Sequence, residues 1–145
     1  MTASISSINY CPVKSISFQT VSDCKIRKNI GIVGDRIFAF SKGLEFNQAQ
    51  LFEKNLDERR GKWNKILTLK NSPVLNKYNF KLKDNKLKFT QKNNEILTID
   101  VSKTSEHELL SNKILELESS LQKPIFLMKN KDIPFFDTSI SNKTL

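Results

Sequence analysis

Short segments in which apolar and polar residues alternate constrain the fold of this chain more than any other feature. In Tyr78–Phe89, Phe80 and Leu82 fall on one side of an extended chain while Lys81 and Lys83 fall on the other. A period of two interrupted by Asp84-Asn85 predicts a β-hairpin with one solvated face. Similar patterns predict further strands at Ser4–Tyr10, Ser15–Ile26, Ile96–Val101 and Ile125–Met128. Within Ile30–Phe40, Gly31 and Gly34 are expected to bracket a short loop before an extended segment at 36–40, and Lys42-Gly43 is expected to turn into a strand at Leu44–Phe46.

Helical periodicity is confined to two places. A short helix or helical turn is expected within 57–69, where apolar residues recur among charges. The clearest helix spans Glu106–Leu121, with Ser105 and Glu108 expected to form a capping box and Pro124 to stop the chain from continuing as a helix. We therefore expect a mainly β (α+β) fold, an antiparallel β-barrel-like domain with one C-terminal amphipathic helix.

The size and composition fit one folded domain. The chain has 145 residues, 38% of them hydrophobic, which is enough to bury a core. The N-terminus lacks a secretory signal, and the apolar stretches are far shorter than the roughly 20 residues that cross a bilayer. Two cysteines, Cys11 and Cys24, are too few for a disulfide scaffold. We expect reduced thiols in a cytoplasmic protein that does not associate with membranes.

The positive charge is concentrated in one region. The chain carries 24 Lys and Arg against 15 Asp and Glu, a formal charge of +9, and residues 59–92 alone account for +10. This stretch is interpreted as a solvated lysine face, with nonspecific nucleic-acid contact as an alternative. Its aromatic residues are expected to face the core and are poor candidates for base stacking. Only four of the 24 basic residues are Arg, and the planar, bidentate guanidinium favours a specific use at each of these positions.

Conventional catalytic constellations are missing from the sequence. No Cys-x-x-Cys, His-Glu-x-x-His, P-loop or Gly-x-Ser-x-Gly motif occurs. The lone His107 falls in the first turn of the expected helix, between two glutamates, which favours a solvated helix-end residue over a metal ligand. We predict no catalytic residue and no metal ligand in this chain.

Two turns between expected strands offer cations to a ligand. Residues 11–15 (Cys-Pro-Val-Lys-Ser) supply the ammonium of Lys14, the hydroxyl of Ser15 and a backbone N–H, which suit a phosphate. Residues 31–36 (Gly-Ile-Val-Gly-Asp-Arg) place the Asp35 carboxylate beside the Arg36 guanidinium. We interpret Asp35 as orienting Arg36 rather than contacting a ligand.

In this order and spacing, Ile8–Ser15 and Gly31–Phe40, followed by Lys42-Gly43, resemble the N-terminal β-barrel domain of the MOSC family, whose pattern is a strand into "YPVKS", a second strand, "GLxGDRxxxL" and a Gly turn. The resemblance implies 1–128 as that domain and 129–145 as a linker toward a MOSC catalytic domain missing from this chain. It also implies a molybdenum-molybdopterin cofactor, with Lys14, Ser15 and Arg36 contacting the pterin or its phosphate.

What the resemblance implies about activity is limited by the departures from the family pattern. Cys11 stands before the Pro and is not expected to bind metal, and the loop at 46–50 lacks an Arg found in the family. With no MOSC domain, the chain is not expected to be catalytic alone. It would be part of a molybdenum-cofactor oxidoreductase or sulfur-transfer protein, with a MOSC catalytic domain in cis or trans and a possible redox protein as partners.

Two alternatives remain open from the sequence. One is a stand-alone β-barrel module that binds an anion or a protein without catalysis. The other is nonspecific nucleic-acid binding through the 59–92 lysines, although nucleic acid is not the partner we expect. The apolar Phe135-Phe136 segment near the end is expected either to lead onward in a longer chain or to dock elsewhere.

Overall fold

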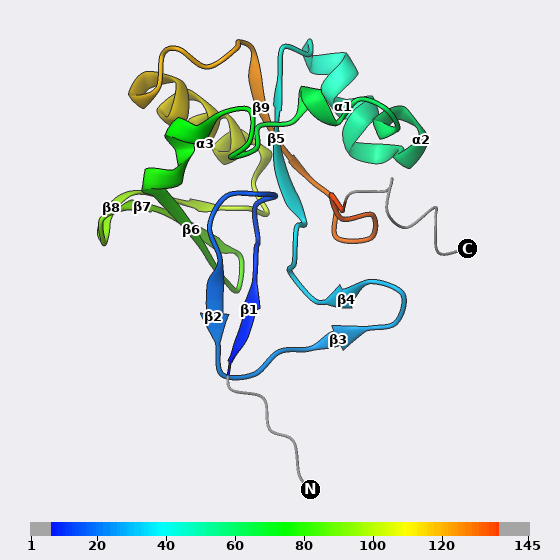
Figure 1. The fold of residues 1–145 in the computed structure, drawn as a ribbon, viewed down its shortest axis with the longest axis vertical. Coiled ribbons are helices and arrows are strands. Elements are labelled where there is room, and N and C mark those ends of the chain that lie inside the picture. The colour runs from blue at the N-terminus through cyan, green and yellow to red at the C-terminus, as the bar shows by residue number, and fades with distance from the viewer. Residues whose placement is uncertain (1–6, 137–145) are drawn as a thin grey trace, which may run out of the picture.

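The computed structural model describes residues 7–136, which form a mixed α/β fold built from four small antiparallel sheets (Figure 1). The sheets pair β1 with β2, β3 with β4, β5 with β9, and β6 with β7 and β8. Within 7–136 they do not close into a barrel. The elements in order are β1 (Ile8–Tyr10), β2 (Gln19–Val21), β3 (Ile26–Arg27), β4 (Gly31–Ile32), β5 (Phe38–Lys42), α1 (Phe46–Lys54), α2 (Leu56–Arg59), the 3₁₀ turns η1 (Trp63–Lys65) and η2 (Pro73–Lys77), β6 (Tyr78–Lys83), β7 (Lys86–Gln91), β8 (Asn94–Asp100), α3 (Thr104–Leu117) and β9 (Ile125–Lys129).

The β5–β9 ribbon lies at the centre of the molecule and separates two cores. Its register runs from Phe38 opposite Lys129 to Lys42 opposite Ile125. Because side chains alternate across a strand, each face of the ribbon is apolar and both faces must be covered. In β5 this places Phe38 and Phe40 in the larger core and Ala39 in the smaller one.

The larger core lies between the ribbon, the β6–β7–β8 sheet and α3. The inner face of that sheet carries Phe80 and Phe89, whose rings stack with centroids 4.9 Å apart. Leu110 and Ile114 of α3 are buried against them, one turn apart on the same side of the helix. Burial of these large side chains supplies most of the apolar area removed from water.

The smaller core lies on the opposite face of the ribbon, beneath α1 and α2. It gathers Phe52 of α1, Ile66 and Met128 with Phe135, which is fully buried. Phe135 therefore does dock onto the domain, one of the two outcomes expected from the sequence. Figure 1 shows the segment after β9 returning beside α2.

The strand predictions hold best for the β6–β7–β8 sheet. The hairpin, its turn and the alternation of inward Phe80 with outward Lys81 are confirmed. The expected Ser15–Ile26 strand is wrong as a continuous element, because only β2 and the start of β3 are extended pairs. The Ser4–Tyr10 strand is found at 8–10, and residues 4–6 lie outside the described part of the chain.

The helix predictions need three corrections. Leu44–Phe46 does not start a strand: α1 begins at Phe46, and the Glu45 N–H donates to the Gln48 side chain at 3.0 Å. This is half of a capping box, a signal the sequence contains. The expected helix within 57–69 is split into α2 and η1, so the fold has more than one helix.

The long helix α3 is shifted from its predicted bounds. It starts two residues earlier and ends at Leu117, while Leu121 is buried beyond its end. Lys103, and not Ser105, is the N-cap residue, and it makes no side-chain cap. The Glu106 carboxylate instead accepts the Asp100 N–H at 3.1 Å, which ties the helix start to the end of β8.

Candidate functional site

The two turns singled out in the sequence lie side by side. Residues 11–14 run parallel to 36–38 and exchange backbone hydrogen bonds with them. The Arg36 N–H donates to the Cys11 carbonyl at 2.6 Å, and the Lys14 N–H donates to the Phe38 carbonyl at 2.8 Å. Segments more than 20 residues apart are therefore held at one end of β5.

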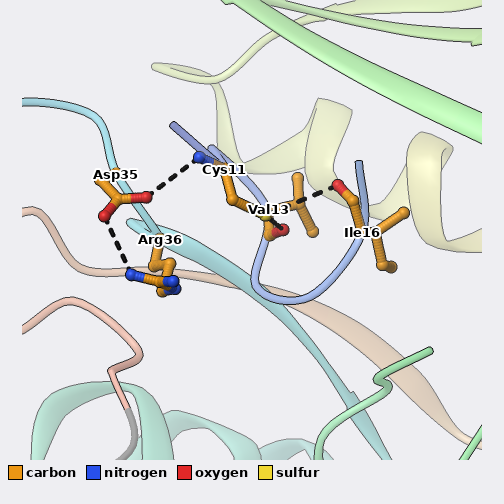
Figure 2. Close-up of polar contacts among 5 residues, drawn as sticks. All are labelled: Cys11, Val13, Ile16, Asp35 and Arg36. Carbon is orange, nitrogen blue, oxygen red and sulfur yellow. Dashed lines mark hydrogen bonds and ion pairs between the residues drawn. The ribbon is translucent and has the colours of Figure 1, made fainter. Parts of the chain in front are cut away.

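Asp35 fastens one turn to the other. One carboxylate oxygen accepts the Cys11 N–H at 3.0 Å, and the other pairs with Arg36 Nη1 at 3.0 Å (Figure 2). Both oxygens are thus occupied by groups of this chain. This agrees with the interpretation that Asp35 orients Arg36.

Arg36 is also held by the segment that follows β9. Its guanidinium lies over the Phe136 ring, 5.5 Å from the centroid, and its carbonyl accepts the Phe135 N–H at 2.8 Å. The residue has a φ of +52°, a conformation uncommon for a non-glycine residue and maintained here by these contacts. The Arg36 side chain is therefore fixed in direction and only partly exposed.

Lys14 and Ser15 open onto a surface pocket of about 580 Å³. The pocket lies between their turn and the loop around η1. Its lining residues are Lys14, Ser15, Trp63, Asn64, Thr68, Lys70 and Asn71. Two of these are cations, none is an acid, and the others apart from Trp63 offer hydroxyl or amide groups, so the pocket suits an anion.

The contacts around the pocket orient its two predicted residues. Lys14 Nζ lies 5.1 Å from the centroid of the Trp63 ring, a cation–π contact. The Ser15 hydroxyl oxygen accepts the Leu69 N–H at 2.8 Å, which leaves the hydroxyl proton available for donation. The structure brings Lys14 and Ser15 together at this pocket, whereas Arg36 is not among the described residues that line it.

Five pocket residues do not emerge from the sequence: Trp63, Asn64, Thr68, Lys70 and Asn71. The spacing of Trp63, Ile66 and Leu67 is that of the short helix expected within 57–69. Trp63 instead begins the short turn η1 and is only half-buried. The only tryptophan of the chain, next to an Asn in a lysine-rich loop, was the available signal.

Cys11 is the first residue of the 11–15 turn, and its thiol is not reactive. Its thiol is buried and donates to the Val13 carbonyl at 2.7 Å. Burial raises the pKa of Cys11 to about 11, and the nearby Arg36 only partly opposes this effect. A buried thiol that stays protonated is a poor nucleophile at neutral pH. Both cysteines are free thiols, as expected.

His107, the remaining candidate from the sequence, makes a structural contact. His107 Nε2 lies 2.9 Å from the Val101 carbonyl, so the ring helps hold the start of α3 against the end of β8. It is half-buried, whereas the sequence had predicted a solvated position. Across residues 7–136 no three His, Cys, Asp or Glu side chains are grouped as they would be around a metal ion.

Comparison with known proteins gives no relative from which a role could be transferred. No family model, curated protein or solved structure matches the chain. None of the helices in the described part is both long enough and apolar enough to cross a membrane. Inference about function therefore depends on the geometry above.

Proposed function

We propose that this chain is an anion-binding accessory domain of the MOSC N-terminal type, acting in the cytoplasm. In this proposal the pocket at Lys14 and Ser15 holds the phosphate-bearing end of a molybdopterin cofactor. A separate or covalently attached MOSC domain would supply the catalytic centre. The observation that carries the proposal is a pocket with two lysines and no carboxylate among its described lining residues, located at the turn that resembles the family motif.

The residues present fit one end of such a cofactor. The Lys14 and Lys70 ammonium groups and the Ser15 hydroxyl would hold a phosphate, since charged donors make the stronger hydrogen bonds to such groups. When bound, the molybdenum centre would supply the redox or sulfur-transfer chemistry. Arg36 pairs with Asp35 and is not among the described residues that line the pocket. It would therefore contact only a part of the cofactor that extends outside the pocket.

A second candidate is a stand-alone module that binds small phosphate-bearing anions without turnover. It is favoured by the described lining, in which two lysines stand beside hydroxyl and amide groups, a combination that suits any small phosphate-bearing anion. The two candidates share the pocket and differ in the ligand. A pterin phosphate ester should bind more tightly than inorganic phosphate only if the first is right.

Trp63 lines the pocket and is the only tryptophan of the chain, so the NMR signal of its indole N–H tests whether a ligand binds there. We expect this signal to shift saturably when the chain is titrated with a pterin phosphate ester. Lys14→Gln and Lys70→Gln should each weaken binding about 10-fold, as expected for loss of a charged hydrogen bond.

The matched control is Lys123→Gln, which removes the same charge at an exposed position before β9. It should bind like the unmodified chain. Equal weakening by all three substitutions would mean that only overall charge is sensed, and would overturn the pocket assignment. Equal affinity for the ester and for inorganic phosphate would favour the stand-alone module.

A further inference from the structure

The register of the β6–β7 hairpin sets lysines directly against lysines. Lys81 is opposite Lys88, and Lys83 is opposite Lys86, and all four side chains are exposed on the outer face of the sheet. Like charges at directly opposed positions destabilise a sheet. The two neighbouring lysine pairs therefore lower the stability of the folded hairpin. The alternation in the sequence alone does not reveal which lysines are opposite each other.

The neighbouring strand neutralises only part of this charge. Asp100 of β8 lies 3.7 Å from Lys86, and Glu95 lies 4.0 Å from Lys88. Asp100 is also held by Ser102, whose hydroxyl and N–H lower the pKa of the carboxyl. Among residues 7–136, Lys81 and Lys83 of the edge strand β6 have no carboxylate within ion-pair distance.

The same alternation leaves no aromatic ring on this outer face. Phe80 and Phe89 alternate with the lysines and stack on each other inside the larger core. The face thus presents ammonium groups without a surface on which a base could stack. A partner would be recognised through its negative charge and not through its base sequence.

We propose that this four-lysine face (Lys81, Lys83, Lys86 and Lys88) binds the phosphate backbone of duplex nucleic acid. Lysines two residues apart on one strand are separated by roughly 7 Å, and those on adjacent strands by about 5 Å. Such a flat grid can contact several phosphates at once. A duplex is favoured over a single strand because its bases are already stacked and need no ring from the protein.

The proposal predicts opposite effects of one substitution on binding and on stability. Lys81→Glu places a carboxylate opposite Lys88, so it should raise the midpoint of thermal unfolding while weakening binding to a fluorescently labelled duplex. We expect the loss of affinity to be about 10-fold at low salt. In the unmodified chain, the slope of log K against log salt should be about −3 to −4, because each neutralised phosphate contributes about −0.9.

The matched control is Lys54→Glu, the same charge reversal at an exposed position of α1. It should weaken binding much less than Lys81→Glu. Lys81 does not line the anion pocket, so Lys81→Glu should leave the pterin phosphate titration of the Trp63 signal unchanged, and failure here can be separated from failure of the anion pocket. Absence of saturable binding at low salt, equal losses for Lys54→Glu and Lys81→Glu, or tighter binding of a single strand than of the duplex would each overturn the proposal.

Discussion

Replacing Arg59 should cost more stability than any other change of a charged residue in the described part of the chain. Its side chain is fully buried at the end of α2, although it opens the basic stretch that the sequence had suggested to be solvated. Nε donates to the Phe52 carbonyl at 2.7 Å, and Nη2 donates to the Glu53 carbonyl at 2.7 Å. Nη1 donates to the carbonyls of residues 133 and 134 at 2.9 and 3.1 Å.

The size of the expected loss of stability follows from the groups that would lose their contacts with Arg59. Burial lowers the pKa of Arg59 to about 10, which expresses the cost of desolvating the guanidinium. That cost is offset by the four hydrogen bonds and by the Phe135 ring, 4.0 Å away. Arg59→Ala would strand buried carbonyls and leave a cavity beside Phe135. Each buried acceptor left without its donor costs about 1–3 kcal/mol, so losing several of these hydrogen bonds at once should cost about 3–5 kcal/mol, a large share of the stability of a typical domain.

Urea unfolding followed by Trp63 fluorescence measures this loss, because Trp63 packs edge-on against Phe52 in the same core. Arg60→Ala is the matched control. Arg60 is exposed and, within residues 7–136, pairs only with Asp57 at 3.4 Å, so its loss should cost less than about 1 kcal/mol. Arg59→Lys should fall between the two, because one ammonium cannot reproduce the planar fork.

A loss for Arg59→Ala within about 1 kcal/mol of the Arg60→Ala value would refute this reasoning. Release of the 133–136 segment alone would be a different result. It would appear as fast hydrogen exchange of the Phe135 N–H, which donates to the Arg36 carbonyl, with the unfolding midpoint of the remaining domain little changed.

Two further predictions concern the turns around the site. The thiol of Cys11 has a pKa of about 11 when folded, against a reference of 9.0. As the pH rises, the thiol therefore loses its proton at a lower pH in the unfolded chain than in the folded one. The free energy of unfolding should fall between pH 9 and 11 by at most about 3 kcal/mol. Cys11→Ala should reduce this pH dependence in urea titrations. Gly34→Ala should destabilise more than Gly31→Ala: both glycines have positive φ, but only at Gly34 would the new Cβ lie 3.2 Å from the Tyr10 ring. Equal midpoints of thermal unfolding for the two variants would contradict this.

The sequence predicts local elements well and distant contacts poorly. The β6–β7–β8 sheet was predictable because its strands are adjacent in the chain and its turns are short. The central pairing of β5 with β9 was not, since it joins strands more than 80 residues apart, both buried on two faces and lacking alternation. The sequence does not predict α1, because Lys42-Gly43 and the residues after it favour a turn into a strand.

The same distinction applies to the candidate site. Compact sequence motifs single out Lys14, Ser15 and Arg36, of which the structure places Lys14 and Ser15 at the pocket and Arg36 outside its described lining. Trp63 and Lys70 reach the pocket from a different segment, which only the tertiary fold brings close. Arg59 gives no sequence signal of its role, because its partners are backbone carbonyls, which every residue possesses.

The net charge of +9 therefore combines groups that respond differently to salt. Arg59 is buried among carbonyls, where added ions cannot screen it, so its contribution to stability should be nearly independent of ionic strength. The lysine pairs of β6 and β7 repel each other in solvent, so added salt should stabilise the domain through them while weakening any contact with phosphates. Stability that rises with salt in the unmodified chain, and less steeply in Lys81→Glu, would locate the repulsion in that hairpin. A salt dependence unchanged by Lys81→Glu would place it elsewhere.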